Sequence, residues 1–190
     1  LPARVGAPTR VYNLPQSDSG LSALPFSVEV AGRLYLGGDT LVCLDLASGE
    51  LTASPPGQVD KDRRVFLFTQ GDRILYLQGT AGTGADSLGE GMDLGTLDPA
   101  TLRLQRTCTV RDADLRALGL DDDSTHAYAA GPGAAQVTLV NTTEGRNRVV
   151  VLGRDGIEKV MELRLEAGAT LGPLVWTKGG DRAYASVFTP

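Results

Sequence analysis

Short apolar runs separated by turn residues recur along most of this 190-residue chain. Runs of about four to eight residues rich in Val, Leu, Ile, Phe and Tyr, bounded by Gly, Asp, Asn, Pro and Ser, are typical of strands joined by tight turns. The pattern predicts strands at residues 26–30, 33–37, 40–46, 50–54, 64–69, 73–78, 92–98, 102–110, 115–119, 125–130, 135–141 and 147–152.

The last third of the chain gives a less regular pattern. In IEKVMELRLEAG, Met161, Leu163 and Leu165 alternate with charged residues. This alternation favours a strand, although the Glu, Lys and Leu content also fits a helix. The final segment, GPLVWTKGGDRAYASVF, predicts two more strands.

The five tyrosines mark a repeat. An Arg or His stands two residues before Tyr12, Tyr35, Tyr128 and Tyr184, and Arg73 stands three residues before Tyr76. From Tyr35 onward the spacings are 41, 52 and 56 residues. Blades of four strands repeat every 40 to 50 residues or so, and loop insertions lengthen that period. Residues two apart on one strand share a face, so a basic residue two positions before a Tyr predicts a packing device that the blades repeat.

A second repeated phrase ends an apolar run with Asp or Asn and a small-residue turn. It reads LVCLDLASGE around Asp45, LGTLDPATLR around Asp98 and VTLVNTTEGR around Asn141. The side chain of the Asp or Asn is predicted to accept a hydrogen bond from the backbone N–H two residues further along the chain. Gly49 and Gly145 are predicted to supply the positive φ of the turn.

These two phrases resemble the β-propeller repeat of YVTN-type, PQQ-type and quinoprotein amine dehydrogenase-like proteins, in which x-LDxxSG or x-IDxxTG joins the third and fourth strands of a blade. The resemblance covers about residues 22–188. Asn141, the absence of Gly after Asp98 and an inserted hairpin-like segment near 147–160 depart from that pattern. A β-sandwich or another meander of hairpins is the alternative, because it uses similar turns.

The resemblance implies one all-β domain over 1–190, a β-propeller or propeller segment of about four four-stranded blades. Three blades and two further strands leave an incomplete ring with an unpaired edge. Either residues 3–15 complete the fourth blade, or the chain is part of a larger propeller. The expected blades cover about 22–57, 58–110, 111–166 and 167–190. If the N-terminal segment completes the fourth blade, that blade also includes 1–20.

The composition limits the kinds of partner that the protein is expected to bind. Eighteen basic and 23 acidic residues give a net charge of -5 without a Lys/Arg run, which excludes nucleic acid and anionic membrane surfaces. The apolar runs are far shorter than the roughly 20 residues of a membrane helix.

A start at Leu1 fits an exported protein that has lost its leader, or a fragment. Cys43 and Cys108 form either one disulfide or two buried thiols.

Residues 78–95 form a long Gly-rich connection between two predicted strands, and long loops are often functional. The segment has neither the GK[ST] of a P-loop nor GxGxxG, so phosphate binding is disfavoured. Asp86, Glu90 and Asp93 in this loop, with Asp112 and Asp114 in the connection to the next blade, are candidate Ca²⁺ ligands. The alternative is that these carboxylates are simply solvated.

His126 is the single histidine, so a multi-His metal centre is excluded. A Ser-His-Asp hydrolase is disfavoured because no GxSxG elbow is present. The leading hypothesis is a non-catalytic propeller that binds or assembles with a protein partner, or with the rest of a larger propeller, in an exported or cell-envelope protein. The alternatives are part of a propeller enzyme, dehydrogenase-like or lyase, and a structural envelope component assembled through strand edges.

Overall fold

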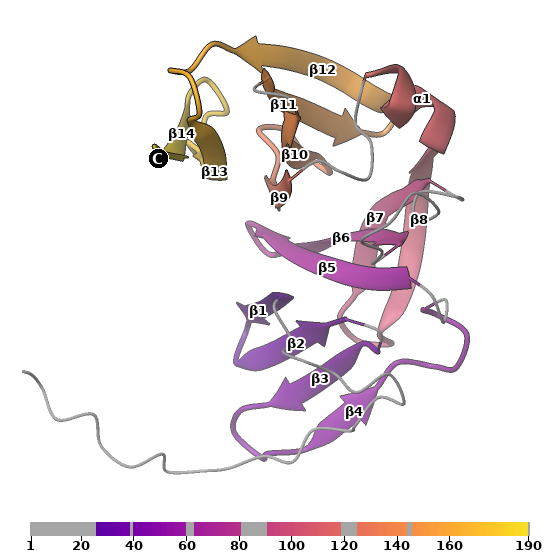
Figure 1. Ribbon diagram of the computed structural model, residues 1–190. Coiled ribbons are helices and arrows are strands. Elements are labelled where there is room, and N and C mark those ends of the chain that lie inside the picture. The colour runs from indigo at the N-terminus through magenta and orange to yellow at the C-terminus, as the bar shows by residue number, and fades with distance from the viewer. Residues whose placement is uncertain are drawn as a thin grey trace, which may run out of the picture.

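A computed structural model describes residues 26–38, 40–59, 63–80, 91–118, 125–143 and 146–189. The fold is all-β, and four small antiparallel sheets follow one another in an arc as the blades of a β-propeller (Figure 1). The prediction of a propeller is therefore confirmed, and the β-sandwich alternative is wrong.

The first two sheets each have four strands in chain order, every one antiparallel to the next. The first sheet contains β1 (Phe26–Val30), β2 (Arg33–Gly37), β3 (Val42–Asp45) and β4 (Leu51–Ala53). The second sheet contains β5 (Arg63–Gln70), β6 (Arg73–Thr80), β7 (Met92–Asp98) and β8 (Arg103–Val110).

A short helix, α1 (Asp112–Ala117), leads from the second sheet to the third. The third sheet contains β9 (Thr125–Ala130), β10 (Val137–Thr143), β11 (Arg146–Gly153) and β12 (Gly156–Leu163). The fourth sheet contains β13 (Thr170–Trp176) and β14 (Ala183–Phe188) within the described residues. The strand predicted from the alternation around Met161 is therefore correct.

One predicted strand is wrong, and the first strand of the third blade is therefore a different one from that predicted. Residues 115–119 were expected to form a strand, but 115–117 form the end of α1, where Leu115 is buried, and residue 119 lies outside the described residues. Asp112 in the first turn and Arg116 in the last suit the helix dipole. The third sheet begins at β9 instead, so Tyr128 lies on an innermost strand and not on a second strand.

Apolar side chains between neighbouring sheets form the core. Tyr35 and Tyr76, each 2% exposed, meet between the first and second sheets. Leu77 and Leu139 pack between the second and third sheets. Burying one large apolar side chain contributes about 1.5–3 kcal/mol, so these contacts hold the blades together.

The predicted Asx turns are confirmed at Asp45 and Asp98. Asp45 Oδ1 accepts from the backbone N–H groups of Ala47 at 3.0 Å and Ser48 at 2.9 Å. Asp98 accepts from the backbone N–H of Ala100 at 2.9 Å and from the Thr101 hydroxyl at 2.6 Å. These bonds place the two carboxylates at the turns between third and fourth strands.

The glycine missing from the second of these turns is replaced by Leu102. Gly49 has φ 79°, and Leu102, at the same place in its turn, has φ 54°. Both backbone N–H groups donate to the Asp carbonyl four residues earlier, at 2.8 and 2.9 Å. The Leu102 side chain is 2% exposed in the core, and that burial offsets the left-handed backbone.

The third turn lies later in the chain than predicted. The backbone of Asn141 lies inside β10, opposite Arg148 on β11. Strand pairing continues to Thr143, beyond the position where the turn was expected. Gly145, which was expected to reverse the chain, lies outside the described residues.

Candidate functional site

The five candidate cation ligands fall into two groups. Asp86 and Glu90 lie outside the described residues. Asp93 lies on β7 and is 6% exposed, whereas Asp112 and Asp114 lie on α1. Because Asp93 pairs with Thr109 near the end of β8 and α1 follows that strand at once, the three described carboxylates lie at one end of the second sheet.

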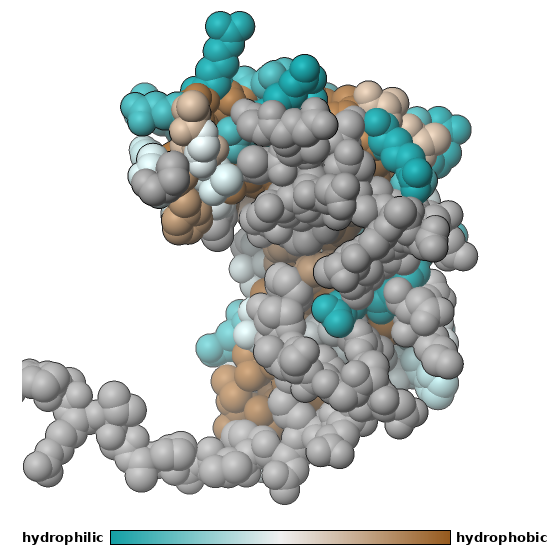
Figure 2. Space-filling model, in the orientation of Figure 1, coloured by the Kyte–Doolittle hydropathy of each residue, from teal (hydrophilic) through white to brown (hydrophobic). Residues whose placement is uncertain are grey.

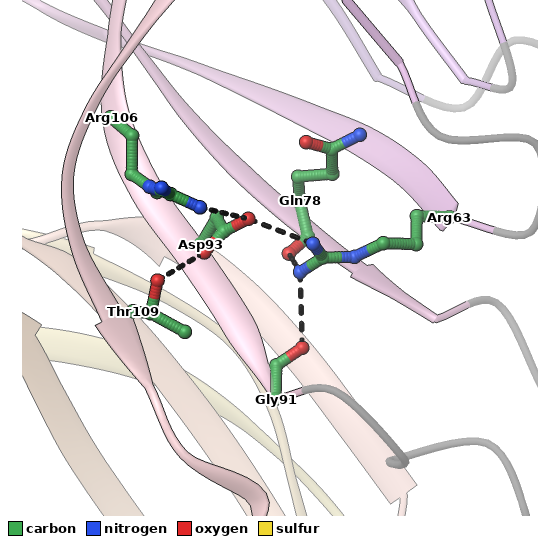
Figure 3. Close-up of polar contacts among 6 residues, drawn as sticks. All are labelled: Arg63, Gln78, Gly91, Asp93, Arg106 and Thr109. Atoms are coloured by element: carbon green, nitrogen blue, oxygen red, sulfur yellow. Dashed lines mark hydrogen bonds and ion pairs between the residues drawn. The ribbon is translucent and has the colours of Figure 1, made fainter.

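Asp93 belongs to a buried polar cluster centred on Arg63 (Figure 3). Arg63 Nη1 donates to Asp93 Oδ2 at 2.7 Å. Arg63 Nη2 donates to the carbonyl oxygens of Gln78 at 2.8 Å and Gly91 at 3.1 Å. Gln78 and Gly91 lie on either side of residues 81–90, so Arg63 links the two parts of the chain that flank this segment.

The second oxygen of Asp93 is also engaged. Thr109 Oγ1 donates to Asp93 Oδ1 at 2.5 Å, and the exposed Arg106 places Nη1 3.7 Å from Asp93 Oδ2. Burial raises the pKa of nearby Tyr76 to about 12, and the negative charge of Asp93 adds to the shift. Asp93 therefore serves as the internal counter-charge of Arg63.

The two carboxylates of α1 have arginine partners of their own. Asp112 Oδ2 lies 2.7 Å from Arg116 Nε, and Asp114 accepts from Arg111 Nε and Nη2 at 2.9 Å each. The hydrogen bond from Arg111 lowers the pKa of Asp114. Among the described residues, no group of three or more His, Cys, Asp or Glu side chains could hold a metal ion. The Ca²⁺ site stays a prediction.

The two cysteines are free thiols on different sheets. Cys43 is buried on β3 and Cys108 is half-buried on β8. Burial raises the pKa of both thiols, so both are held in the protonated form at neutral pH.

A cavity of about 540 Å³ lies where the innermost strands of the four sheets approach one another. Gln70 on β5 lies in one wall, where its Oε1 accepts a hydrogen bond from the backbone N–H of Ala135 at 2.8 Å. In the opposite wall, Trp176 Nε1 donates to Thr138 Oγ1 at 2.9 Å. The lining includes Val28, Phe68, Gln70, Ala129, Leu174 and Trp176.

The fourth sheet packs on the third sheet through one face of β13. Ala183, Ala185 and Val187 of β14 pair with β13 residues that pack on the third sheet. The other face carries Tyr184 and Phe188, which are 66% and 59% exposed. Figure 2 shows apolar surface in this part of the molecule.

This sheet also holds the most exposed large apolar side chains of the described residues. Val175 is 68% exposed and Val187 is 48% exposed, in addition to the two aromatic rings. Every residue of β14 is exposed, and among the described residues β14 pairs only with β13. Within the part of the chain that the structure describes, the sheet therefore presents an apolar face, and β14 is its outer strand.

Comparison with protein-family models, with curated proteins and with solved structures found no match. The fold itself defines the class of protein, a β-propeller of four sheets, and this class is compatible with a binding or assembly module. No helix among the described residues is long and apolar enough to cross a membrane.

Proposed function

We propose that this protein is a non-catalytic binding or assembly module whose docking surface is the open face of β13–β14 together with the outer edge that β14 presents within the described residues. The observation that carries the proposal is the exposure of all six residues of β14, an edge strand with no charged side chain. The buried charged cluster supports a structural role for Arg63 and Asp93, because protein groups bind both oxygens of Asp93. Export to the cell envelope stays a prediction of the sequence.

An edge strand offers a row of unpaired backbone N–H and C=O groups to any extended segment that approaches it. Adding a strand to such an edge gives affinity through main-chain hydrogen bonds and specificity through alternate side chains. On β14, Tyr184 and Phe188 would contact one face of the added strand, while Val187 would contact the other. An uncharged strand rich in apolar residues is the partner that this edge fits.

A fluorescent peptide carrying residues 183–188, flanked by lysine pairs for solubility, tests the proposal. Fluorescence polarisation should show saturable binding to the wild-type protein. Ser186→Lys, which places a charge in the middle of the edge, should abolish it. The matched control is Thr52→Lys on β4, an exposed position on another outer strand, and it should bind as the wild type does. Equal binding by the Ser186→Lys variant would refute edge docking.

A further inference from the structure

We infer that the cavity where the four innermost strands approach one another is a binding site for a small aromatic carboxylate. Its volume of about 540 Å³ lies within the roughly 300–1,000 Å³ that is typical of small-molecule sites. All four sheets contribute to its lining, through Val28 on β1, Phe68 on β5, Ala129 on β9 and Leu174 on β13. The inference does not rest on the docking surface proposed for β13–β14.

Most of the lining is apolar, and one large aromatic ring belongs to it. Trp176 is half-buried, and its Nε1–H donates at 2.9 Å to the hydroxyl of Thr138, which is fully buried. Because a protein group satisfies the indole N–H, the ring is held in one orientation and presents its carbon surface to the cavity. Phe68 adds a second ring to the lining. Such walls suit a ligand with a flat apolar ring.

Contacts within the protein fix the shape of the cavity. The side-chain amide of Gln70 accepts from the backbone N–H of Ala135 at 2.8 Å and donates to the carbonyl oxygen of Gly133. A Cβ atom on Gly180 would lie 2.6 Å from the carbonyl oxygen of Pro132, so the turn after β13 packs directly on that segment. Walls that are formed before a ligand arrives need little ordering when it binds.

Lys178 supplies the charge that selects the ligand. It lies in the turn after β13, and it is the one charged side chain among the described residues that line the cavity. Asp181, the carboxylate of the same turn, accepts from the Thr177 hydroxyl at 2.6 Å and lies 3.8 Å from Arg182. Lys178 forms no ion pair with the residues that the structure describes. A lysine beside an apolar cavity complements a carboxylate that is joined to an apolar ring.

Phenylacetate is a suitable probe, because it joins one ring to one carboxylate. Trp176 is the sole tryptophan of the chain, so tryptophan fluorescence reports on this cavity directly. Phenylacetate should change the emission in a saturable manner, with a dissociation constant on the order of 1 mM because the ligand is small. Isothermal titration calorimetry, which does not depend on the indole, should give the same constant.

A second probe and three variants test the role of the charge. Phenylacetamide has nearly the same shape without the charge and should bind about fivefold more weakly than phenylacetate. Lys178→Met should weaken phenylacetate binding by about the same factor and should bind the two probes equally well. Lys178→Arg should keep the preference for phenylacetate. Lys159→Met, which removes an exposed lysine on β12, is the matched control and should bind as the wild type does.

Three results would overturn the inference. Unchanged emission and no heat at about 10 mM phenylacetate would show that the cavity takes up no ring, which is also expected if another part of the chain fills it. Equal binding of phenylacetate and phenylacetamide to the wild type would show that charge does not select the ligand. Equal binding of phenylacetate to Lys178→Met and to the wild type would show that Lys178 is not the selecting group.

This inference and the proposed function can fail separately. Ser186 on β14 is not among the residues that line the cavity. Ser186→Lys, which tests strand docking, should therefore bind phenylacetate as the wild type does. Loss of peptide binding with intact phenylacetate binding leaves the cavity site standing, and the opposite result leaves strand docking standing.

Discussion

Arg63 on β5 donates a hydrogen bond to Asp93 on β7 across the intervening strand β6, with 2.7 Å between Nη1 and Oδ2. Both side chains are buried, at 7% and 8% exposure. Removing one partner of such a pair leaves a buried charge without compensation. Arg63→Met should therefore lower the free energy of unfolding by about 3–5 kcal/mol, measured by urea denaturation.

Arg106 supplies the matched control for this prediction. It lies 3.7 Å from the same carboxylate oxygen, but its side chain is 64% exposed. Exposed ion pairs contribute about 0–1 kcal/mol, so Arg106→Met should change stability little. Similar losses in the two variants would show that burial is not what makes the Arg63 pair important.

At position 102, a Gly variant should be more stable than an Ala variant, which is the reverse of the usual order. The φ of 54° at this position costs an Ala residue roughly 1–2 kcal/mol that Gly does not pay. Both Leu102→Gly and Leu102→Ala lose the buried side chain, but Leu102→Gly should be the more stable of the two by about 1 kcal/mol. Gly49→Ala, at the equivalent position, should cost a similar amount. Urea denaturation of the three variants measures this, and a more stable Leu102→Ala would contradict it.

Asp98 should contribute to acid sensitivity. The Thr101 hydroxyl, followed by the backbone N–H of Ala100, lowers the pKa of Asp98 below its ordinary 3.8. A carboxyl group with a lowered pKa in the folded state stabilises the protein above its unfolded pKa, and this contribution is lost as the pH falls further. Stability measured between about pH 5 and pH 2 should therefore fall less steeply in Thr101→Val than in the wild type. An unchanged slope would contradict this role for the hydroxyl.

Tyr76 should make the protein sensitive to alkali. Burial, with a contribution from Asp93, raises the pKa of its phenol from 10.0 to about 12. Between these values the unfolded chain loses the phenolic proton while the folded protein keeps it, so stability falls as the pH rises. Denaturation at pH values from about 9 to 11 should show a shallower fall for Tyr76→Phe. An equally steep fall in Tyr76→Phe would contradict this role for the phenol.

The strands of the first two sheets could be predicted from the sequence because their signals are local. Alternating apolar residues and an Asp that accepts from its own turn, as at Asp45 and Asp98, need no distant partner. Arg33, two residues before Tyr35 on β2, lies beside Asp45 on the neighbouring strand, with 3.6 Å between Nε and Oδ2. Local chemistry was enough in these places.

The candidate site was harder to predict. Asp93 was assigned to a loop of cation ligands, whereas it lies inside β7 with Arg63 as its partner. The one available signal was its position within the apolar run MDLGTL, where a lone carboxylate on the inward face needs a partner. That partner is 30 residues away, and its identity depends on how three strands align.

The sequence by itself determined the main strands and two of the turns, because periodicity and turn chemistry act over a few residues, and the resemblance of its repeated phrases to propeller repeats implied the class of fold. Only the tertiary structure decided that 115–117 belong to a helix, that Tyr128 lies on an innermost strand, and which of the described tyrosines are buried. Tyr35 and Tyr184 share one sequence motif, yet the first is 2% exposed and the second 66%. The difference arises because a second sheet covers Tyr35, while Tyr184 faces away from the third sheet, so burial depends on neighbours that no local pattern specifies.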